Sequence, residues 1–104
     1  MNQVMLVGRL VKDPELIKGD NNKKMSHITI AVPRSFKNMN GEYDTDFINC
    51  TLWDAIAKNT CEYCKKGNIV GVRGRVQNNV VEQKDGTKKY YLDIVAERVT
   101  FLSS

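Results

Sequence analysis

The segment from Asp46 to Trp53 carries large apolar side chains on both faces of one predicted β-strand. Successive side chains of a strand point to opposite faces. One face is apolar and predicts a core contact, through Ile48, Cys50 and Leu52. The other face carries two aromatic rings, Phe47 and Trp53, separated by two polar residues, Asn49 and Thr51.

Two interpretations of the second face remain open. The rings of Phe47 and Trp53 either lie under a loop or a subunit interface, or stand in solvent beside polar groups. In the second case they form a surface on which unpaired nucleic-acid bases can stack.

The composition describes one globular domain, residues 1–104. The chain has 41% hydrophobic residues, a formal net charge of +4 and a pI of about 9.0, which favours a polyanionic partner. No segment approaches the roughly 18 apolar residues of a membrane span, and the start lacks the pattern of a signal peptide. Three cysteines, an odd number, fit a reducing compartment. A cytoplasmic protein with no membrane association is expected.

Five strands and one helix are predicted from apolar periodicity. The expected strands are 2–12 with a bulge or a sharp bend at Gly8, a second that includes 28–32 and ends at Pro33, then 46–53, 68–77 and 89–101. A mobile loop is expected over 34–44, and a helix capped by Asp54 is expected to reach about Lys66. Asp85-Gly86 predicts a two-residue hairpin turn, and the alternation slips before Val99 as a bulge would produce. This order predicts an all-β protein with one helix, a five-stranded OB-fold barrel with the helix between strands 3 and 4.

Cationic residues accompany the aromatic ones. Phe36 stands between Arg34 and Lys37, and Arg73 and Arg75 share one face of the fourth strand. Rings interleaved with cations stack bases and neutralise phosphates together. The predicted DNA contacts are Phe36, Phe47, Trp53, Arg9, Arg34, Lys37, Asn49, Thr51, Arg73, Arg75, Lys84 and Lys88.

Catalytic, metal and cofactor sites are not expected. The one histidine, His27, lies in a predicted strand, where a structural role is favoured. Cys61 and Cys64 have C-x-x-C spacing, but only Cys50 and His27 remain to complete a zinc site. A metal or redox role for this pair stays open as an alternative hypothesis.

Several motifs resemble the bacterial single-stranded DNA-binding protein family along essentially the whole chain. They are Asn2 to Leu10 with Asp13-Pro14-Glu15, Ile28 to Val32 followed by Arg34 to Lys37, Asp46 to Trp53, Glu62 to Gly67, Gly74-Arg75-Val76 and the Asp85-Gly86 hairpin. The order and spacing of these motifs make the resemblance specific.

The resemblance implies a homotetramer that binds single-stranded DNA, in the cytoplasm and associated with the nucleoid. The family's stacking aromatics fall on Phe36, Phe47 and Trp53, and a further family tryptophan falls on Val81, which predicts weaker stacking at the last hairpin. The sequence ends at Ser104 without the family's acidic tail, so reduced recruitment of replication enzymes is expected. An alternative within the same fold is a primosome-type adaptor that mainly holds other proteins on DNA.

Overall fold

The computed structural model describes residues 1–103. Its elements are β1 (Val4–Leu10), β2 (Ile17–Lys18), the 3-10 turn η1 (Asp20–Asn22), β3 (Lys24–Lys37), β4 (Tyr43–Trp53), α1 (Asp54–Tyr63), β5 (Ile69–Glu82) and β6 (Lys88–Ser103). Five long strands and one helix between the third and fourth of them confirm the predicted fold class. The short β2 and η1 were not predicted.

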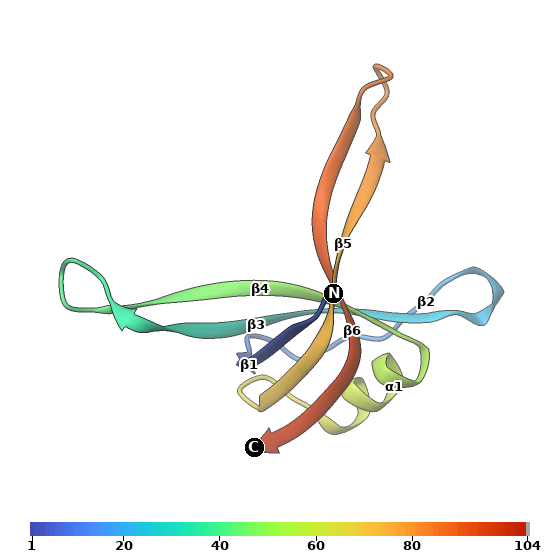
Figure 1. The fold of residues 1–104 in the computed structure, drawn as a ribbon. Helices are drawn as coiled ribbons and strands as arrows, with labels where there is room; N and C mark the ends of the chain where they lie inside the picture. The colour runs from blue at the N-terminus through green and yellow to red at the C-terminus, as the bar shows by residue number, and fades with distance from the viewer. Residues whose placement is uncertain (104) are drawn as a thin grey trace.

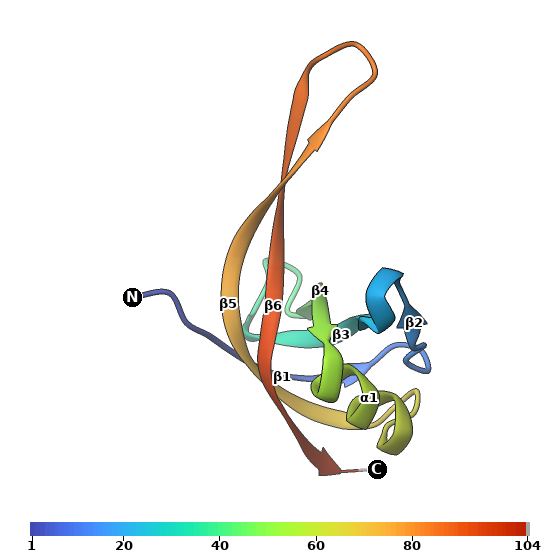
Figure 2. The ribbon, with the colours of Figure 1, turned by 90° about the vertical axis from the view of Figure 1, so that its right-hand side faces the viewer.

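The strands form a closed barrel. Their order is β1-β5-β6-β4-β3-β2, and an additional pairing of β1 with β3 closes the sheet. All pairs are antiparallel except β4 with β6. Two hairpins, β3–β4 and β5–β6, extend well beyond the barrel in different directions (Figure 1), and α1 lies at the end of the barrel away from the β5–β6 hairpin tip (Figure 2).

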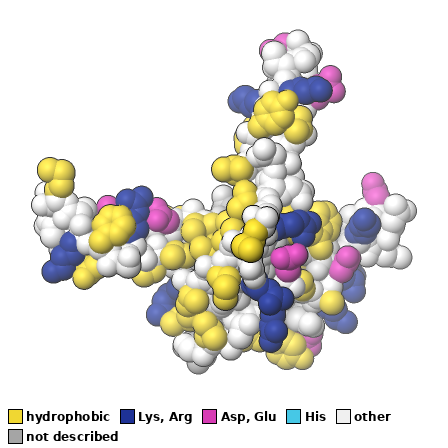
Figure 3. Space-filling view, in the orientation of Figure 1, with side chains coloured by type: hydrophobic (Ala, Val, Ile, Leu, Met, Phe, Trp, Pro, Cys, Tyr) yellow, Lys and Arg dark blue, Asp and Glu magenta, His cyan; other side chains and the backbone are white. Residues whose placement is uncertain are grey.

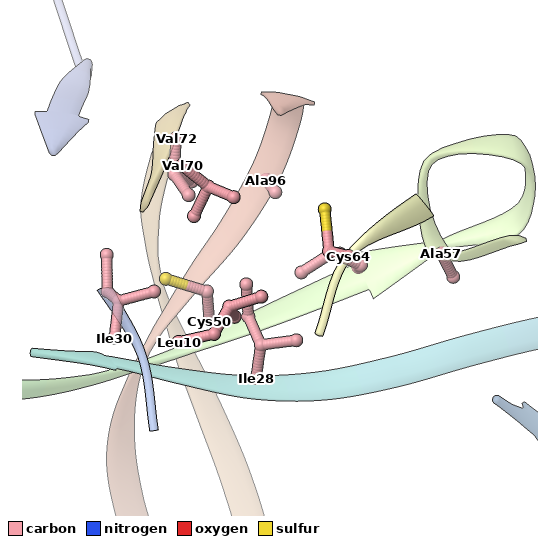
Figure 4. Close-up of a cluster of buried hydrophobic side chains, with 10 residues drawn as sticks. Leu10, Ile28, Ile30, Cys50, Ala57, Cys64, Val70, Val72 and Ala96 are labelled. Atoms are coloured by element: carbon pink, nitrogen blue, oxygen red, sulfur yellow. The ribbon is translucent and has the colours of Figure 1, made fainter. Parts of the chain in front are cut away.

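The core fills the barrel with aliphatic and thiol side chains (Figure 4). Cys50 and Leu52 are fully buried, which confirms the predicted inner face of this strand. Burial raises the pKa of the Cys50 thiol to about 11, with a further contribution from the charge of Asp93. The cluster consists of Leu10, Ile28, Ile30, Cys50, Leu52, Ala57, Cys64, Val70, Val72 and Ala96.

Gly8 allows β1 and β3 to approach closely. The predicted bulge at Gly8 is wrong, because this residue pairs in regular register with Val70. A Cβ atom at Gly8 would lie 2.7 Å from the carbonyl oxygen of Ala31. The glycine therefore permits the close approach of β1 and β3 that closes the barrel.

The segment predicted as a mobile loop, 34–44, is mostly β-hairpin. Pro33 does not end the strand, since it pairs with Thr45 and the ladder resumes at Lys37 opposite Tyr43 after an irregular stretch. The reversal is a tight turn in which Asn38 accepts a bond from Gly41 N–H at 3.0 Å, and Gly41 has φ +80°. The side-chain oxygen of Asn38 also accepts from two backbone N–H groups, which orders the turn.

The β5–β6 hairpin ends in the same kind of turn. Gly86 N–H donates to the carbonyl of Gln83 at 3.0 Å, and Gly86 has φ +86°. The loop between the last hydrogen-bonded residues is thus Lys84-Asp85-Gly86, one residue longer than the predicted two-residue turn. Farther along the β5–β6 pair, Arg73 of β5 is opposite Arg98 and Gly74 is opposite Ala96, so Glu97 is an additional residue on β6. This register shift confirms the predicted bulge before Val99.

Helix α1 is shorter than predicted. It ends at Tyr63, because the N–H groups of Lys65 and Lys66 bond to side chains of Asn68 and Asp13 instead of continuing the helical ladder. The predicted cap at Asp54 is also wrong. Trp53 occupies the capping position with no side-chain bond, and Asp54 is the first helical residue, with φ +49°.

Candidate nucleic-acid interface

Several of the predicted contacts lie on the outside of the barrel. Residues directly opposite each other in neighbouring strands point to the same face of a sheet. Phe47 is opposite Ala31, which is opposite Arg9, so these three residues form a row across β4, β3 and β1. We call this side of the sheet, opposite the core, the outer face.

The other rows of the outer face follow from the same pairings. Asn49 is opposite Thr29, and Trp53 is opposite Met25, which is opposite Ile17 of β2. A further row crosses four strands. It runs from His27 through Thr51 and Val95 to Arg75.

The two rings predicted for stacking are exposed. Phe47 is 67% exposed and Trp53 is 41% exposed. Phe47 is thus largely open to solvent within the monomer, whereas Trp53 is partly covered. Phe36 is 64% exposed and lies farther out on β3, in the irregular part of the hairpin. Each of the three rings therefore offers an aromatic surface to solvent.

Asn49 lies between the rings with one end of its amide fixed. The hydroxyl of Thr29 donates to the side-chain oxygen of Asn49 at 2.7 Å. The amide nitrogen of Asn49 is left to donate to a ligand. This arrangement offers a polar contact in the space between the two stacking surfaces.

Thr51 does not lie on the surface as predicted. It is only 4% exposed, because its hydroxyl takes part in hydrogen bonds within the sheet. The hydroxyl donates to Asp93 Oδ1 at 2.9 Å and contacts His27 Nδ1 at 3.2 Å. The hydroxyl has a single proton, which it donates to Asp93. In the contact between His27 and Thr51, His27 Nδ1 is therefore the donor and the hydroxyl oxygen is the acceptor. Thr51 is thus a positioning residue rather than a contact.

Side-chain hydrogen bonds continue from Asp93 of β6 to Asn79 and then along β5. Asn79 donates to Asp93 Oδ2 at 3.2 Å, and Gln77 donates to Asn79 at 3.3 Å. Arg75 in turn donates to Gln77 at 3.3 Å. A polar network therefore joins His27 on β3 to Arg75 on β5 and holds the outer face in one conformation. Sequence alternation placed Arg75 on this face but gave no signal for the network.

The predicted cations differ in how they are paired. Arg34 makes two bonds to Asp46, at 3.0 and 3.1 Å, and lies 3.8 Å from Asp44. Its hydrogen bond to Asp46 raises the pKa of Arg34 and lowers the pKa of Asp46. Arg75 lies 3.6 Å from Glu97. These two arginines are partly neutralised, which sequence alone did not reveal.

The other predicted cations form no ion pair within residues 1–103. Within residues 1–103, no carboxylate oxygen lies within 4.0 Å of Arg9, Lys37, Arg73, Lys84 or Lys88. Arg9 donates to the carbonyl of Gly67 at 2.7 Å, and Lys37 lies 5.9 Å from the ring centre of Tyr43. Lys84 and Lys88 lie at the tip of the β5–β6 hairpin. Hydrophobic and basic side chains stand close together on both long hairpins (Figure 3).

The structure also shows exposed aromatic residues beyond the predicted contacts. Tyr90 and Tyr91 are both exposed on β6. Tyr91 is opposite Asn79 and shares the outer face with Asp93. Tyr63 on α1 is largely exposed and makes a tilted contact with Phe101, with ring centres 6.1 Å apart.

Neither a metal centre nor a membrane segment is evident in the described part of the chain. Residues 1–103 contain no cluster of three or more potential metal ligands. Cys61 is half-buried and Cys64 is buried, and burial raises the pKa of the Cys64 thiol. None of the helices in this range is both long and apolar enough to cross a bilayer.

Comparison with known proteins agrees with this geometry. Residues 1–102 match the model of the single-strand binding protein family. The chain is 48% identical to single-stranded DNA-binding protein B of Bacillus subtilis, over 97% of the chain and 89% of the relative. It is 46% identical to the single-stranded DNA-binding protein of Bacillus cereus over 98% of the chain, and spans 60% of that relative. The chain belongs to the single-strand binding protein family.

Proposed function

We propose that this chain binds and protects single-stranded DNA, largely independently of base sequence and without catalysing a reaction. The observation that supports this most is the exposure of Phe47 and Trp53 on one face that also carries Arg9 and Arg75. Every base has a flat face, so stacking tolerates any sequence and contributes about 1–3 kcal/mol for each base. Family membership and the names of the relatives point the same way.

The proposed path of the strand follows the outer face and both hairpins. Phe47 and Trp53 stack bases, and Asn49 donates to a base or a phosphate between them. Phe36, Arg34 and Lys37 continue the path on the β3–β4 hairpin, and Lys84 and Lys88 continue it on the β5–β6 hairpin. Arg9, Arg73 and Arg75 neutralise phosphates. Such a protein serves replication, recombination, repair or DNA uptake, at the nucleoid.

Exposed apolar surface supports the proposal that the chain forms a homotetramer. Met5 and Val7 on β1 stand in solvent and line a largely apolar hollow with Gly71 and Thr100, and Arg73 and Arg98 also border it. On the β5–β6 hairpin, Leu92 is 78% exposed. Apolar surface of this kind is covered in proteins that associate. In a tetramer of this 11.8 kDa chain, neighbouring subunits would cover these exposed apolar residues.

Fluorescence titration tests the proposed function. Trp53 is the only tryptophan, so its emission reports directly on the outer face. Oligo(dT) should quench this emission strongly, and duplex DNA of equal length should compete poorly. Affinity should fall with salt by about 0.7 log units per tenfold salt for each phosphate contacted. Weak binding by a dimer in solution would instead favour the adaptor function.

A further inference from the structure

A hollow beside Trp53 is built by the short arm that the sequence did not predict. Ile17, Met25 and Trp53 form its floor, since they stand opposite one another in β2, β3 and β4. Gly19, Asp20 and Lys23 line it as well, and its volume is about 250 Å³. Drug-sized sites start at about 300 Å³, so this hollow suits a single flat ring system.

The arm is folded so that residues of its turn line the hollow together with the floor residues. Gly19 N–H donates to the carbonyl of Lys23 at 2.8 Å, which closes the turn. Within it, Asn21 and Asn22 both have left-handed backbones, with φ of 63° and 61°. Asparagine adopts this conformation more readily than most residues. The turn therefore places Lys23 and Asp20 at the rim of the hollow.

The floor is apolar and open to solvent. Ile17 is 45% exposed, Met25 is half-buried and Trp53 is 41% exposed. A thioether and an aliphatic group beside an indole provide polarisable surface that fits a base without demanding a particular one. Lys23 is the cation of the rim, and it makes no ion pair within residues 1–103. Asp20 repels phosphate, which directs a strand toward Lys23.

We propose that this hollow is a binding subsite for one nucleobase of single-stranded DNA, with the base on Trp53, Met25 and Ile17 and its phosphate near Lys23. The inference rests on the proposed function and extends it, because it adds β2 and η1 to the contact surface. The hollow is continuous with the outer face through Trp53, and its rim cation matches the charge of the strand.

The test uses the full chain and oligo(dT), with Trp53 emission as the readout. The variant Ile17→Ala/Met25→Ala should bind about tenfold more weakly and show a smaller maximal quench of Trp53. Lys23→Ala should flatten the salt dependence by about one phosphate contact. Lys18→Ala is the matched control, because Lys18 follows Ile17 in β2 and so points to the opposite face.

The outcomes separate this subsite from the general function. Unchanged affinity and quench in a folded Ile17→Ala/Met25→Ala variant would overturn the subsite while leaving single-strand binding by the wild type intact. A change in solution mass without a change in DNA binding would identify the hollow as a subunit contact and overturn it too. A wild-type chain that fails to bind oligo(dT) would reject the proposed function and the subsite together. Urea unfolding of each variant confirms that it is folded.

Discussion

The hydroxyl of Thr51 on β4 donates a 2.9 Å hydrogen bond to the carboxylate of Asp93 on β6. These strands form the only parallel pair among the described residues, and that pairing consists of Cys50 with Ile94 and Thr51 with Val95. The side-chain bond therefore reinforces a junction of the barrel that has only two residue pairs. It also starts the polar network that reaches Arg75.

The substitution Thr51→Val should destabilise the fold. Valine keeps the shape of threonine but removes the hydroxyl, so Asp93 and His27 each lose a partner. The free energy of unfolding should fall by about 1–2 kcal/mol, measured by urea denaturation, while affinity for oligo(dT) stays within about threefold of the wild type. A large loss of DNA affinity with unchanged stability would instead make Thr51 a direct contact.

The substitution Glu97→Gln should strengthen DNA binding. Glu97 lies 3.6 Å from Arg75, so its removal frees an arginine on the outer face. The slope of log affinity against log salt should steepen by about 0.7, the value for one further phosphate contact on a single strand. Glu62→Gln removes the same charge from the exposed side of α1 and serves as the control. Equal effects of the two variants would show that only net charge matters.

The substitution Gly8→Ala should weaken the barrel closure. Its Cβ would meet the carbonyl oxygen of Ala31 at 2.7 Å, a backbone atom that cannot move without shifting β3. Overpacking of this kind costs about 1–3 kcal/mol of stability. Gly71→Ala is the matched control, because its nearest neighbour would be the flexible Leu102 side chain at 3.6 Å. Equal stability of the two variants would contradict this account of Gly8.

Stability should decline at alkaline pH through Cys50. The pKa of its thiol rises from 9.0 to about 11 in the folded chain, mainly through burial. Between these values the unfolded chain loses the proton and the folded chain keeps it, so the free energy of unfolding falls as pH rises. The loss should reach on the order of 1–2 kcal/mol by pH 10.5.

Comparison with Cys50→Ala isolates this effect. Urea unfolding from pH 7.5 to 10.5 should show the difference in stability between wild type and variant shrinking above pH 9. A constant difference would show that the Cys50 thiol is not responsible.

Thiol labelling at pH 8 should modify Cys61 first, since Cys50 and Cys64 are buried.

The long strands and their faces were predictable from period-two alternation. Ile48, Cys50 and Leu52 point inward and Phe47 and Trp53 outward, because a strand offers no other arrangement of neighbouring side chains. The slip before Val99 revealed the β6 bulge for the same reason. Alternation thus predicted the faces of the strands, whereas the local rules for the cap at Asp54 and for the Asp85-Gly86 turn did not hold.

Features set by tertiary contacts were not predictable. Pro33 ends many strands, yet here the hairpin continues past it, since β4 supplies partners on either side of it. Thr51 alternates like a surface residue but is covered because Asp93 and His27, both distant in sequence, converge on it. The carboxylates that pair with Arg34 and Arg75 were likewise visible only in three dimensions.

The most direct test of the central claim removes the two rings of the outer face together. Phe47→Ala/Trp53→Ala should lose about 2–6 kcal/mol of binding free energy, or about 1–3 for each ring, measured by anisotropy of a labelled oligo(dT). The control is Tyr63→Ala/Phe101→Ala, which removes two exposed rings where α1 meets β6. Affinity should fall strongly in the first variant and stay near the wild-type value in the second. Wild-type affinity in a folded Phe47→Ala/Trp53→Ala protein would contradict the central claim.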